Sequence, residues 1–271
     1  MKTVLTATIL TLTATGAFAA SDCAAGKTLT EGTLTIATGN PAYFPWVIDD
    51  APEGKQGFEA AVAYAIAGEM GFADEAVTWV RTSFDEAIQP GQKNFDLNMQ
   101  QYSITADRDR MVDFSAPYYI APQAVMTTVE AVEAGAEPTM DSLRTMKWGV
   151  VASTTALPVV MERIKPDQSP LVYDDNANIT AAMQAGQIDA ALFDLPTALF
   201  TAAVLMDNGV VLGQFDPAEA ENPDRFGALM PEGSALKECV DQALASLTES
   251  GTLAAIQAEW LQDAVGVPLI K

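Results

Sequence analysis

Short apolar runs alternate with helical patterns along this chain, and they do so in two successive sets. The apolar runs cover residues 34–37, 77–80, 95–99, 148–151, 171–173 and 188–193. Strands that alternate with helices are typical of α/β units built on parallel sheets. Two such sets predict an α/β fold of two doubly wound lobes, with a cleft between them in which a small ligand can bind.

Local signals mark several helix ends. Ser83 with Glu86 three residues later forms a capping box, and Asn176 can cap a later helix. Asp194 precedes Leu-Pro and is expected to begin another helix, because proline is favoured in the first turn. Residues 128–138, rich in alanine and glutamate, are expected to form a surface loop. The remaining long helical patterns are 58–70 and two helices within 234–261.

The N-terminus has the features of a secretory signal peptide. Lys2 is followed by an apolar, threonine-rich stretch at residues 4–15 and by Ala-Phe-Ala at 17–19, a small-x-small cleavage pattern. The stretch is too short for a good membrane span. We therefore expect residues 1–19 to be removed. A lipid anchor on Cys23 is rejected because Asp22 directly precedes it.

Composition excludes several partners and chemistries. The chain has 36 acidic and 14 basic residues, a net charge of −22, so nucleic acid and anionic lipid are poor partners. It has no histidine, which removes histidine-based triads, general bases and metal sites. We expect no metal, no cofactor, no catalytic residue and no insertion into the membrane.

Two cysteines, Cys23 and Cys239, lie near opposite ends of the secreted chain. An even count in an oxidising compartment favours a disulfide between them. The alternative is a pair of buried free thiols.

A specific resemblance is carried by residues 95–119, which read FDLNMQQYSITADRDRMVDFSAPYY. This segment is similar to the signature of the polar amino-acid-binding proteins of bacterial ABC importers, the bacterial extracellular solute-binding protein family 3. Shorter matches follow the family's order at residues 57–59, 148–150, 153–155 and 186–191. Each short motif is weak alone, but their order and spacing together are specific.

The resemblance implies the fold of a type II periplasmic binding protein, with a hinge of two crossover strands. Lobe 1 would comprise residues 24–122 and 228–271, and lobe 2 would comprise residues 123–227. The chain would cross between the lobes near residues 119–125 and 226–229.

The resemblance also implies that Arg108 holds the α-carboxylate of the ligand, and a guanidinium can grip a carboxylate with two parallel hydrogen bonds. The alternative is a surface arginine paired with Asp107 or Asp109. The family's counterpart of Asp194 binds the α-ammonium, whereas the plainer role for Asp194 is a helix N-cap.

A second anion site is expected where Ser153, Thr154 and Thr155 follow a strand and open a helix, because unpaired amides and hydroxyls meet there. Simple capping is the alternative. The family usually begins this loop with glycine, so Ser153 departs from its pattern.

The side-chain pocket is expected to include aromatic walls at Tyr43 and Phe84, with Asn40 and Gln101 beside them; Trp46 could instead be core. Basic-amino-acid binders often carry Asp where Asn40 stands, which argues mildly against lysine, arginine or histidine as ligand. The complete set of expected ligand-binding residues is Arg108, Asp194, Thr155, Thr154, Ser103, Tyr43, Phe84, Asn40 and Gln101.

The function implied is a periplasmic, monomeric binding protein that closes on a polar amino acid or similar zwitterion and delivers it to a membrane permease. Opines, betaines and ectoine-like solutes stay open as ligands. Two alternatives use the same scaffold: a dehydratase-like enzyme, with an acidic residue as general acid, and a soluble ligand sensor.

Overall fold

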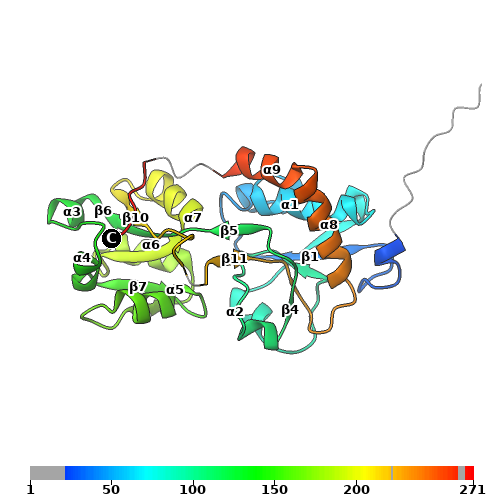
Figure 1. The fold of residues 1–271 in the computed structure, drawn as a ribbon, viewed down its shortest axis with the longest axis horizontal. Helices are drawn as coiled ribbons and strands as arrows, with labels where there is room; N and C mark the ends of the chain where they lie inside the picture. The colour runs from blue at the N-terminus through cyan, green and yellow to red at the C-terminus, as the bar shows by residue number, and fades with distance from the viewer. Residues whose placement is uncertain (1–21, 221, 262–265) are drawn as a thin grey trace, which may run out of the picture.

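The computed structural model describes residues 22–220, 222–261 and 266–271, and the signal peptide expected at residues 1–19 lies outside them. Two lobes stand side by side along the long axis of the molecule, and each is built around a five-stranded sheet (Figure 1). None of the described helices is both long and apolar enough to cross a bilayer.

The first lobe has the strand order β2-β1-β3-β12-β4, in which β1 pairs in parallel with β2 and β3, and β12 runs antiparallel to β3 and β4. Its strands are β1 (Leu34–Thr38), β2 (Val77–Arg81), β3 (Leu97–Asn98), β4 (Asp113–Phe114) and β12 (Leu229–Met230). Its α-helices are α1 (Phe58–Glu69), α2 (Phe84–Ile88), α8 (Lys237–Glu249) and α9 (Thr252–Trp260). Its short 3-10 turns are Asp22–Ala24, Ile48–Asp50, Pro52–Gly54, Asp74–Ala76 and Arg108–Arg110.

The second lobe has the strand order β10-β6-β9-β7-β8, in which β7 pairs in parallel with β8 and β9, and β6 runs antiparallel to β9 and β10. Its strands are β6 (Gln123–Thr128), β7 (Trp148–Val151), β8 (Leu171–Tyr173), β9 (Ala190–Asp194) and β10 (Gly209–Gln214). Its helices are α3 (Val129–Glu133), α4 (Met140–Thr145), α5 (Ala156–Pro158), α6 (Asn176–Gln184) and α7 (Leu195–Phe200). Helices α5 and α7 continue as π-type turns at Val159–Ile164 and Thr201–Leu205.

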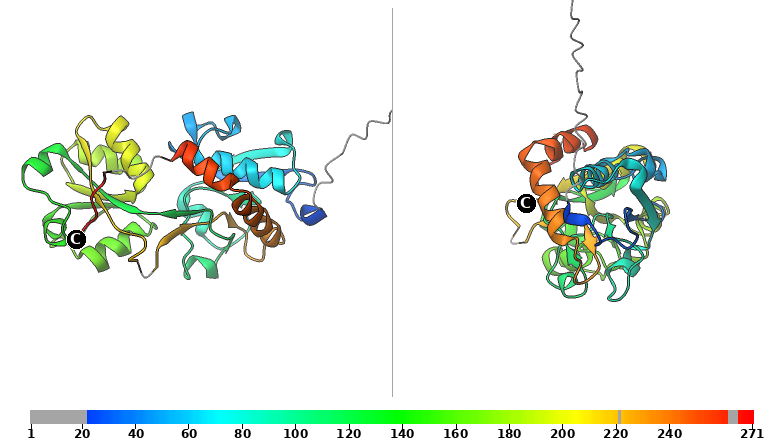
Figure 2. Two further views of the ribbon diagram at one scale, coloured as in Figure 1. Left: turned by 45° about the horizontal axis from the view of Figure 1, so that its top comes forward. Right: turned by 90° about the vertical axis from the view of Figure 1, so that its right-hand side faces the viewer.

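Two antiparallel strands, β5 (Tyr119–Ala121) and β11 (Asp224–Phe226), form a separate ribbon between the lobes (Figures 1 and 2). The register pairs Tyr119 with Phe226 and Ala121 with Asp224. The structure confirms the predicted α/β fold of two lobes joined by crossover strands.

The C-terminal residues lie against the second lobe, which differs from the expectation that 228–271 belongs to the first. The backbone N–H of Gln214 donates to the Pro268 carbonyl at 2.9 Å, and the N–H of Ile270 donates to the Gln214 carbonyl at 2.9 Å. Ile270 packs on the core of this lobe. The tail therefore extends the free edge of β10, and the two ends of the described chain lie in opposite lobes (Figure 2).

Two local expectations are corrected. Thr128 caps a short helix, α3, because its hydroxyl accepts a hydrogen bond from the N–H of Ala131, so residues 128–138 are only partly loop. Helix α6 is capped one residue earlier than expected, by Asp175 rather than Asn176: Oδ1 of Asp175 accepts from the N–H of Asn178 at 2.8 Å.

Glycine at position 57 fixes how α1 meets the loop before it. Gly57 has a φ of 101°, and a Cβ at this position would lie 2.6 Å from the carbonyl oxygen of Trp46. Any other side chain would push the two segments apart. Trp46 is fully buried in the first lobe's core, which agrees with the alternative that this residue is part of the core and not of the ligand pocket.

A buried carboxyl group, Glu59, joins the first turn of α1 to the segment after β3. It accepts hydrogen bonds from the backbone N–H of Gln101 at 2.7 Å, from the Gln101 side-chain amide and from the Tyr118 hydroxyl. Burial raises the pKa of Glu59 from 4.5 to about 7, against the opposing effect of these hydrogen bonds. The group is therefore partly protonated near neutral pH.

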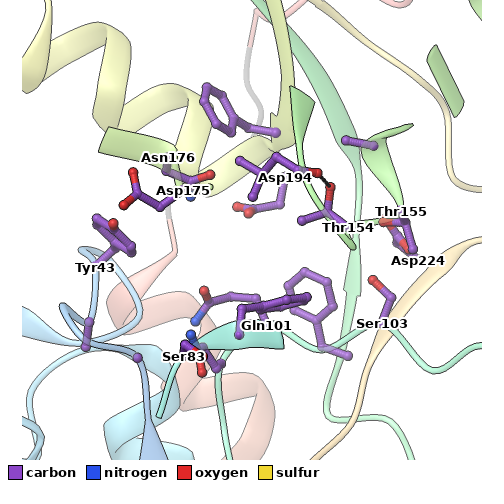
Figure 3. A pocket seen from close by; sticks show the side chains of 18 of the residues that line it. Tyr43, Ser83, Gln101, Ser103, Thr154, Thr155, Asp175, Asn176, Asp194 and Asp224 are labelled. Carbon is purple, nitrogen blue, oxygen red and sulfur yellow. Dashed lines mark hydrogen bonds between the residues drawn. The ribbon is translucent and has the colours of Figure 1, made fainter. Parts of the chain in front are cut away.

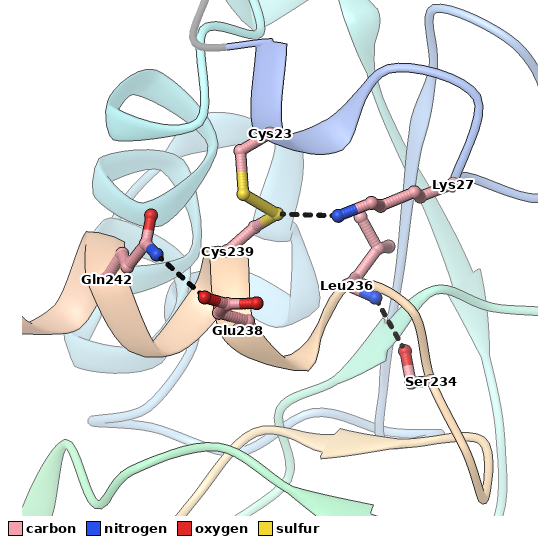
Figure 4. The surroundings of a disulfide bond; sticks show 7 residues. All are labelled: Cys23, Lys27, Ser234, Leu236, Glu238, Cys239 and Gln242. Atoms are coloured by element: carbon pink, nitrogen blue, oxygen red, sulfur yellow. Dashed lines mark hydrogen bonds between the residues drawn. A yellow bond between two sulfur atoms is a disulfide. The ribbon is translucent and has the colours of Figure 1, made fainter.

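The predicted disulfide is confirmed. Cys23 and Cys239 are bonded, with their Cα atoms 5.7 Å apart and a sequence separation of 216 (Figure 4). The bond ties the start of the described chain to α8, where Cys239 is buried.

Removing the disulfide should lower the stability of the folded state. The double variant Cys23→Ala/Cys239→Ala should lose about 2–5 kcal/mol of unfolding free energy, because the bond no longer restricts the unfolded chain. Urea unfolding of the variant and of the wild type with and without dithiothreitol measures this loss. Wild-type stability that does not change on reduction would contradict the structural role of the bond.

Glu59 should make stability depend on pH. A carboxyl group whose pKa is raised in the folded state stabilises at low pH, and this contribution is lost as the pH rises from about 4.5 through about 7. Wild type should therefore lose roughly 2–3 kcal/mol relative to Glu59→Gln between pH 5 and pH 8, because each tenfold difference in proton affinity between the folded and unfolded chains contributes about 1.4 kcal/mol.

Urea unfolding of both proteins at each pH measures the difference, and the exposed Glu69→Gln on the same helix is the matched control. Parallel pH profiles for wild type and Glu59→Gln would show that Glu59 is already ionised in the folded protein at pH 5.

Candidate functional site

A cavity of about 310 Å³ lies between the two lobes (Figure 3). The loops that follow β1, β2, β3, β7 and β8 line it, together with the end of β9 and residues of the crossover strand β11. In open α/β sheets the carboxyl ends of parallel strands are where ligands bind, because the strand order leaves a crevice there. The topology of both sheets therefore directs their loops into one shared space.

All nine residues expected to bind the ligand line this cavity. They come from both lobes: Asn40, Tyr43, Phe84, Gln101, Ser103 and Arg108 from the first, and Thr154, Thr155 and Asp194 from the second. The fold brings these nine residues together around one cavity. The contact that each makes with a ligand remains a prediction.

Arg108 lies in a short 3-10 turn within the signature and is almost completely buried. Its Nη1 donates to the carbonyl of Ser103 at 2.8 Å and its Nη2 donates to the carbonyl of Ser153 at 2.7 Å. Burial lowers the pKa of Arg108, and the charge of Asp224 opposes this shift; a guanidinium stays cationic even so. Asp107 pairs with Arg110 instead, so Arg108 is not a surface ion-pair residue.

The bond from Arg108 to Ser153 joins the two lobes directly. Ser153 has a φ of 59°, the left-handed conformation that favours glycine, so the serine adopts a turn that a glycine would take without strain. Two more contacts cross the cleft: Nε1 of Trp46 donates to the Thr197 hydroxyl at 2.9 Å, and the rings of Phe44 and Phe200 lie 4.3 Å apart. The lobes are thus in contact around the cavity.

The threonines at the start of α5 have different partners. Thr154 donates through its hydroxyl to the Val151 carbonyl at 2.8 Å, which closes the turn after β7. Thr155 donates to Oδ2 of Asp224 at 3.0 Å, and the amide of Gln123 donates to the same oxygen at 2.6 Å. Asp224 was not among the predicted residues, although an acidic residue beside an expected crossover strand is a signal that could have identified it.

Asp194 ends β9 and begins α7. Its Oδ1 accepts from the backbone N–H of Thr197 at 2.8 Å, so it is a helix N-cap and a cavity-lining residue at once. Shielding from bulk water raises the pKa of Asp194 to about 6, the hydrogen bonds from Thr197 oppose this rise, and the like charge of Asp224 adds to it. The carboxyl group is mostly ionised at pH 7.

Gln101 and Phe84 form the first lobe's side of the cavity. The side-chain amide of Gln101 donates a hydrogen bond to the buried carboxyl group of Glu59, and this bond fixes the orientation of the Gln101 side chain. Phe84 stacks on Tyr102 with ring centroids 4.5 Å apart, and the Arg108 guanidinium lies 5.3 Å from the Phe84 ring centroid. The aromatic surface and the cation are therefore adjacent.

The opposite end of the cavity holds two acidic residues, Asp174 and Asp175, that were not among the predicted ligand-binding residues. Figure 3 shows Tyr43, Asp175 and Asn176 grouped at one end, away from Ser103, Thr155 and Asp224. Burial raises the pKa of Tyr43, and the charge of Asp175 raises it further. Asp174 and Asp175 directly follow the predicted strand 171–173, and their place at a strand's carboxyl end was the available signal.

Chemically, the cavity presents one cation, Arg108, and several carboxylates to one small space. A guanidinium on one lobe and a carboxylate on the other can hold the two charges of a zwitterion. The cavity volume is at the small end of ligand pockets, which suits a molecule the size of an amino acid.

Comparisons with known proteins identify relatives of similar sequence and fold. The L-cystine-binding protein TcyJ of Escherichia coli (strain K12) is 27% identical over 237 residues, which cover 86% of this chain and 84% of the relative. The structure of an ancestral arginine-binding protein bound to arginine superposes with a TM-score of 0.69 at 24% identity, covering 86% of this chain and 99% of that one.

A third similar structure is that of the ancestral amino acid-binding protein AncCDT-1, a precursor of cyclohexadienyl dehydratase. It has a TM-score of 0.68 at 26% identity and covers 85% of this chain and 96% of that one.

The resemblance seen in the sequence is confirmed by a family model that matches residues 34–263, the greater part of the chain. Its description is bacterial extracellular solute-binding proteins, family 3, and the chain belongs to that family.

Proposed function

We propose that this protein is the periplasmic substrate-binding component of an ABC importer and that it captures an amino-acid-like zwitterion by closure of its two lobes. The observation that carries the proposal is the placement of Arg108 and Asp194 on opposite walls of one cavity. After export and removal of residues 1–19, the protein acts as a monomer that delivers its ligand to a membrane permease.

The ligand carboxylate binds the guanidinium of Arg108. This group already donates to one carbonyl in each lobe, those of Ser103 and Ser153. A carboxylate gains more than a carbonyl from the same donor, because the attraction between two opposite full charges adds to the hydrogen bond and the carboxylate can accept two parallel bonds. The incoming carboxylate therefore replaces at least the bond to Ser153 and becomes the link between the lobes.

The ligand ammonium binds Asp194, whose side chain is held in place by Thr197. One such ion pair at 4 Å gives about 4 kcal/mol at an effective dielectric of ~20, before the cost of desolvation. A ligand that makes one contact on each lobe prefers the closed arrangement, and this preference is the mechanism of capture.

Relatives support binding rather than turnover. TcyJ carries the name of an L-cystine-binding protein, and AncCDT-1 is described as amino acid-binding although it is a precursor of an enzyme. The cavity has a carboxyl group with a pKa of about 6, Asp194, that could serve as a general acid. In our proposal its charge is used to hold the ammonium instead.

Removing either charge should weaken binding strongly. Thermal-shift screening of wild type against the L-amino acids identifies the best ligand, because binding raises the melting temperature by linkage. Calorimetry with that ligand should then show that Arg108→Gln and Asp194→Asn each lose at least about 30-fold in affinity, since each leaves a ligand charge unpaired. Asparagine can still cap α7, so the second variant should fold.

Exposed neighbours provide the matched controls. Arg110→Gln and Asp109→Asn lie in the same 3-10 turn as Arg108 but do not line the cavity, and both should bind like the wild type. Normal binding by Arg108→Gln or Asp194→Asn would refute the assignment of the two charges.

A further inference from the structure

The residues that line the cavity carry more negative than positive charge. Among the described residues that line it, four are acidic, namely Asp174, Asp175, Asp194 and Asp224, and Arg108 is the only basic one. A simple zwitterion brings one charge of each sign and leaves this excess of negative charge unchanged. The cavity therefore favours a ligand with a net positive charge.

The acidic groups are divided between the two ends. Asp224 lies at the end near Arg108, where it accepts from Thr155 and Gln123 and its charge acts on the guanidinium. Asp194 has the ligand ammonium as its expected partner. The remaining pair, Asp174 and Asp175, has no cation opposite it among the described residues lining the cavity.

Asp175 is held so that its charge faces the cavity. Its Oδ1 caps α6 through the N–H of Asn178, which fixes the side chain at the helix start while leaving a second carboxylate oxygen. Figure 3 shows this carboxylate pointing toward the ring of Tyr43 across the cleft, at the end opposite Ser103 and Asp224. The aromatic ring and the carboxylate come from different lobes and meet at the same end.

An aromatic face beside a fixed carboxylate is suited to a cationic head group. A guanidinium or ammonium gains from the charge of the carboxylate and from the electrons of the ring. A ligand anchored by its carboxylate at Arg108 and by its ammonium at Asp194 would extend its side chain toward this end.

We infer that the ligand is an amino acid with a second cationic group at the end of its side chain, and that Asp175 and Tyr43 bind that group. The inference rests on the proposed function, because it assumes that the α-carboxylate is held at Arg108. It also revises the expectation that uncharged Asn40 argues against a basic amino acid as ligand. In this inference Asp175, on the other lobe, supplies the carboxylate that position 40 lacks.

Isosteric ligands of different charge test the inference. L-Arginine and L-citrulline have nearly the same shape, but citrulline carries a neutral urea group in place of the guanidinium. Calorimetry on the wild-type protein should give L-arginine at least a tenfold higher affinity than L-citrulline. In Asp175→Asn, which keeps the helix cap, the ratio of the two affinities should fall to within about twofold of one.

The matched control is Asp207→Asn, which removes the same charge from an exposed position outside the cavity and should keep the wild-type ratio. Equal or tighter binding of L-citrulline than of L-arginine would overturn the inference while the proposed function stands. An unchanged ratio in Asp175→Asn would overturn the assignment to Asp175. Failure of L-citrulline, L-cystine and every common L-amino acid to bind would overturn the proposed function as well.

Discussion

A buried guanidinium cannot lose its charge, and the packing around Arg108 follows from this constraint. The cation needs hydrogen-bond acceptors on every side that water does not reach. The fold supplies a carbonyl acceptor from each lobe, those of Ser103 and Ser153, and the negative charge of Asp224 on the crossover strand favours the cation. The guanidinium of Arg108 contacts both lobes and is also the group that would bind the ligand carboxylate. Ligand binding and closure of the lobes therefore depend on the same side chain.

The rest of the site depends on rigid support from the elements behind it. Glu59, buried at the start of α1, holds the Gln101 segment, and the stacking of Phe84 on Tyr102 holds the aromatic wall. Asp194 and Asp175 are each fixed by capping a helix, α7 and α6 respectively. A charge whose position is set by the backbone loses little conformational entropy when it meets its ligand. Capping and recognition are therefore compatible uses of the same carboxylates.

Much of this arrangement could be predicted from sequence because it is local. The order of the apolar runs, the start of α7 at Asp194 and the position of Arg108 in the signature are all visible within short windows. Asp224 and the C-terminal residues were not predicted for a physical reason: Asp224 acts through Thr155 and Gln123, far away in sequence, and residues 266–271 pair with the edge of β10. Asp175 was missed because Asn176 was expected to cap α6, and the position of Asp175 near Tyr43 depends on how the opposite lobe is placed.

A crystal structure with the amino acid that gives the largest thermal stabilisation tests the central claim most directly. The ligand carboxylate should lie within about 2.7–3.2 Å of the Arg108 guanidinium, and its ammonium should lie at the same distance from the Asp194 carboxylate, with the lobes closed around both. A ligand bound with its charges reversed, or outside the space between these two residues, would contradict the account.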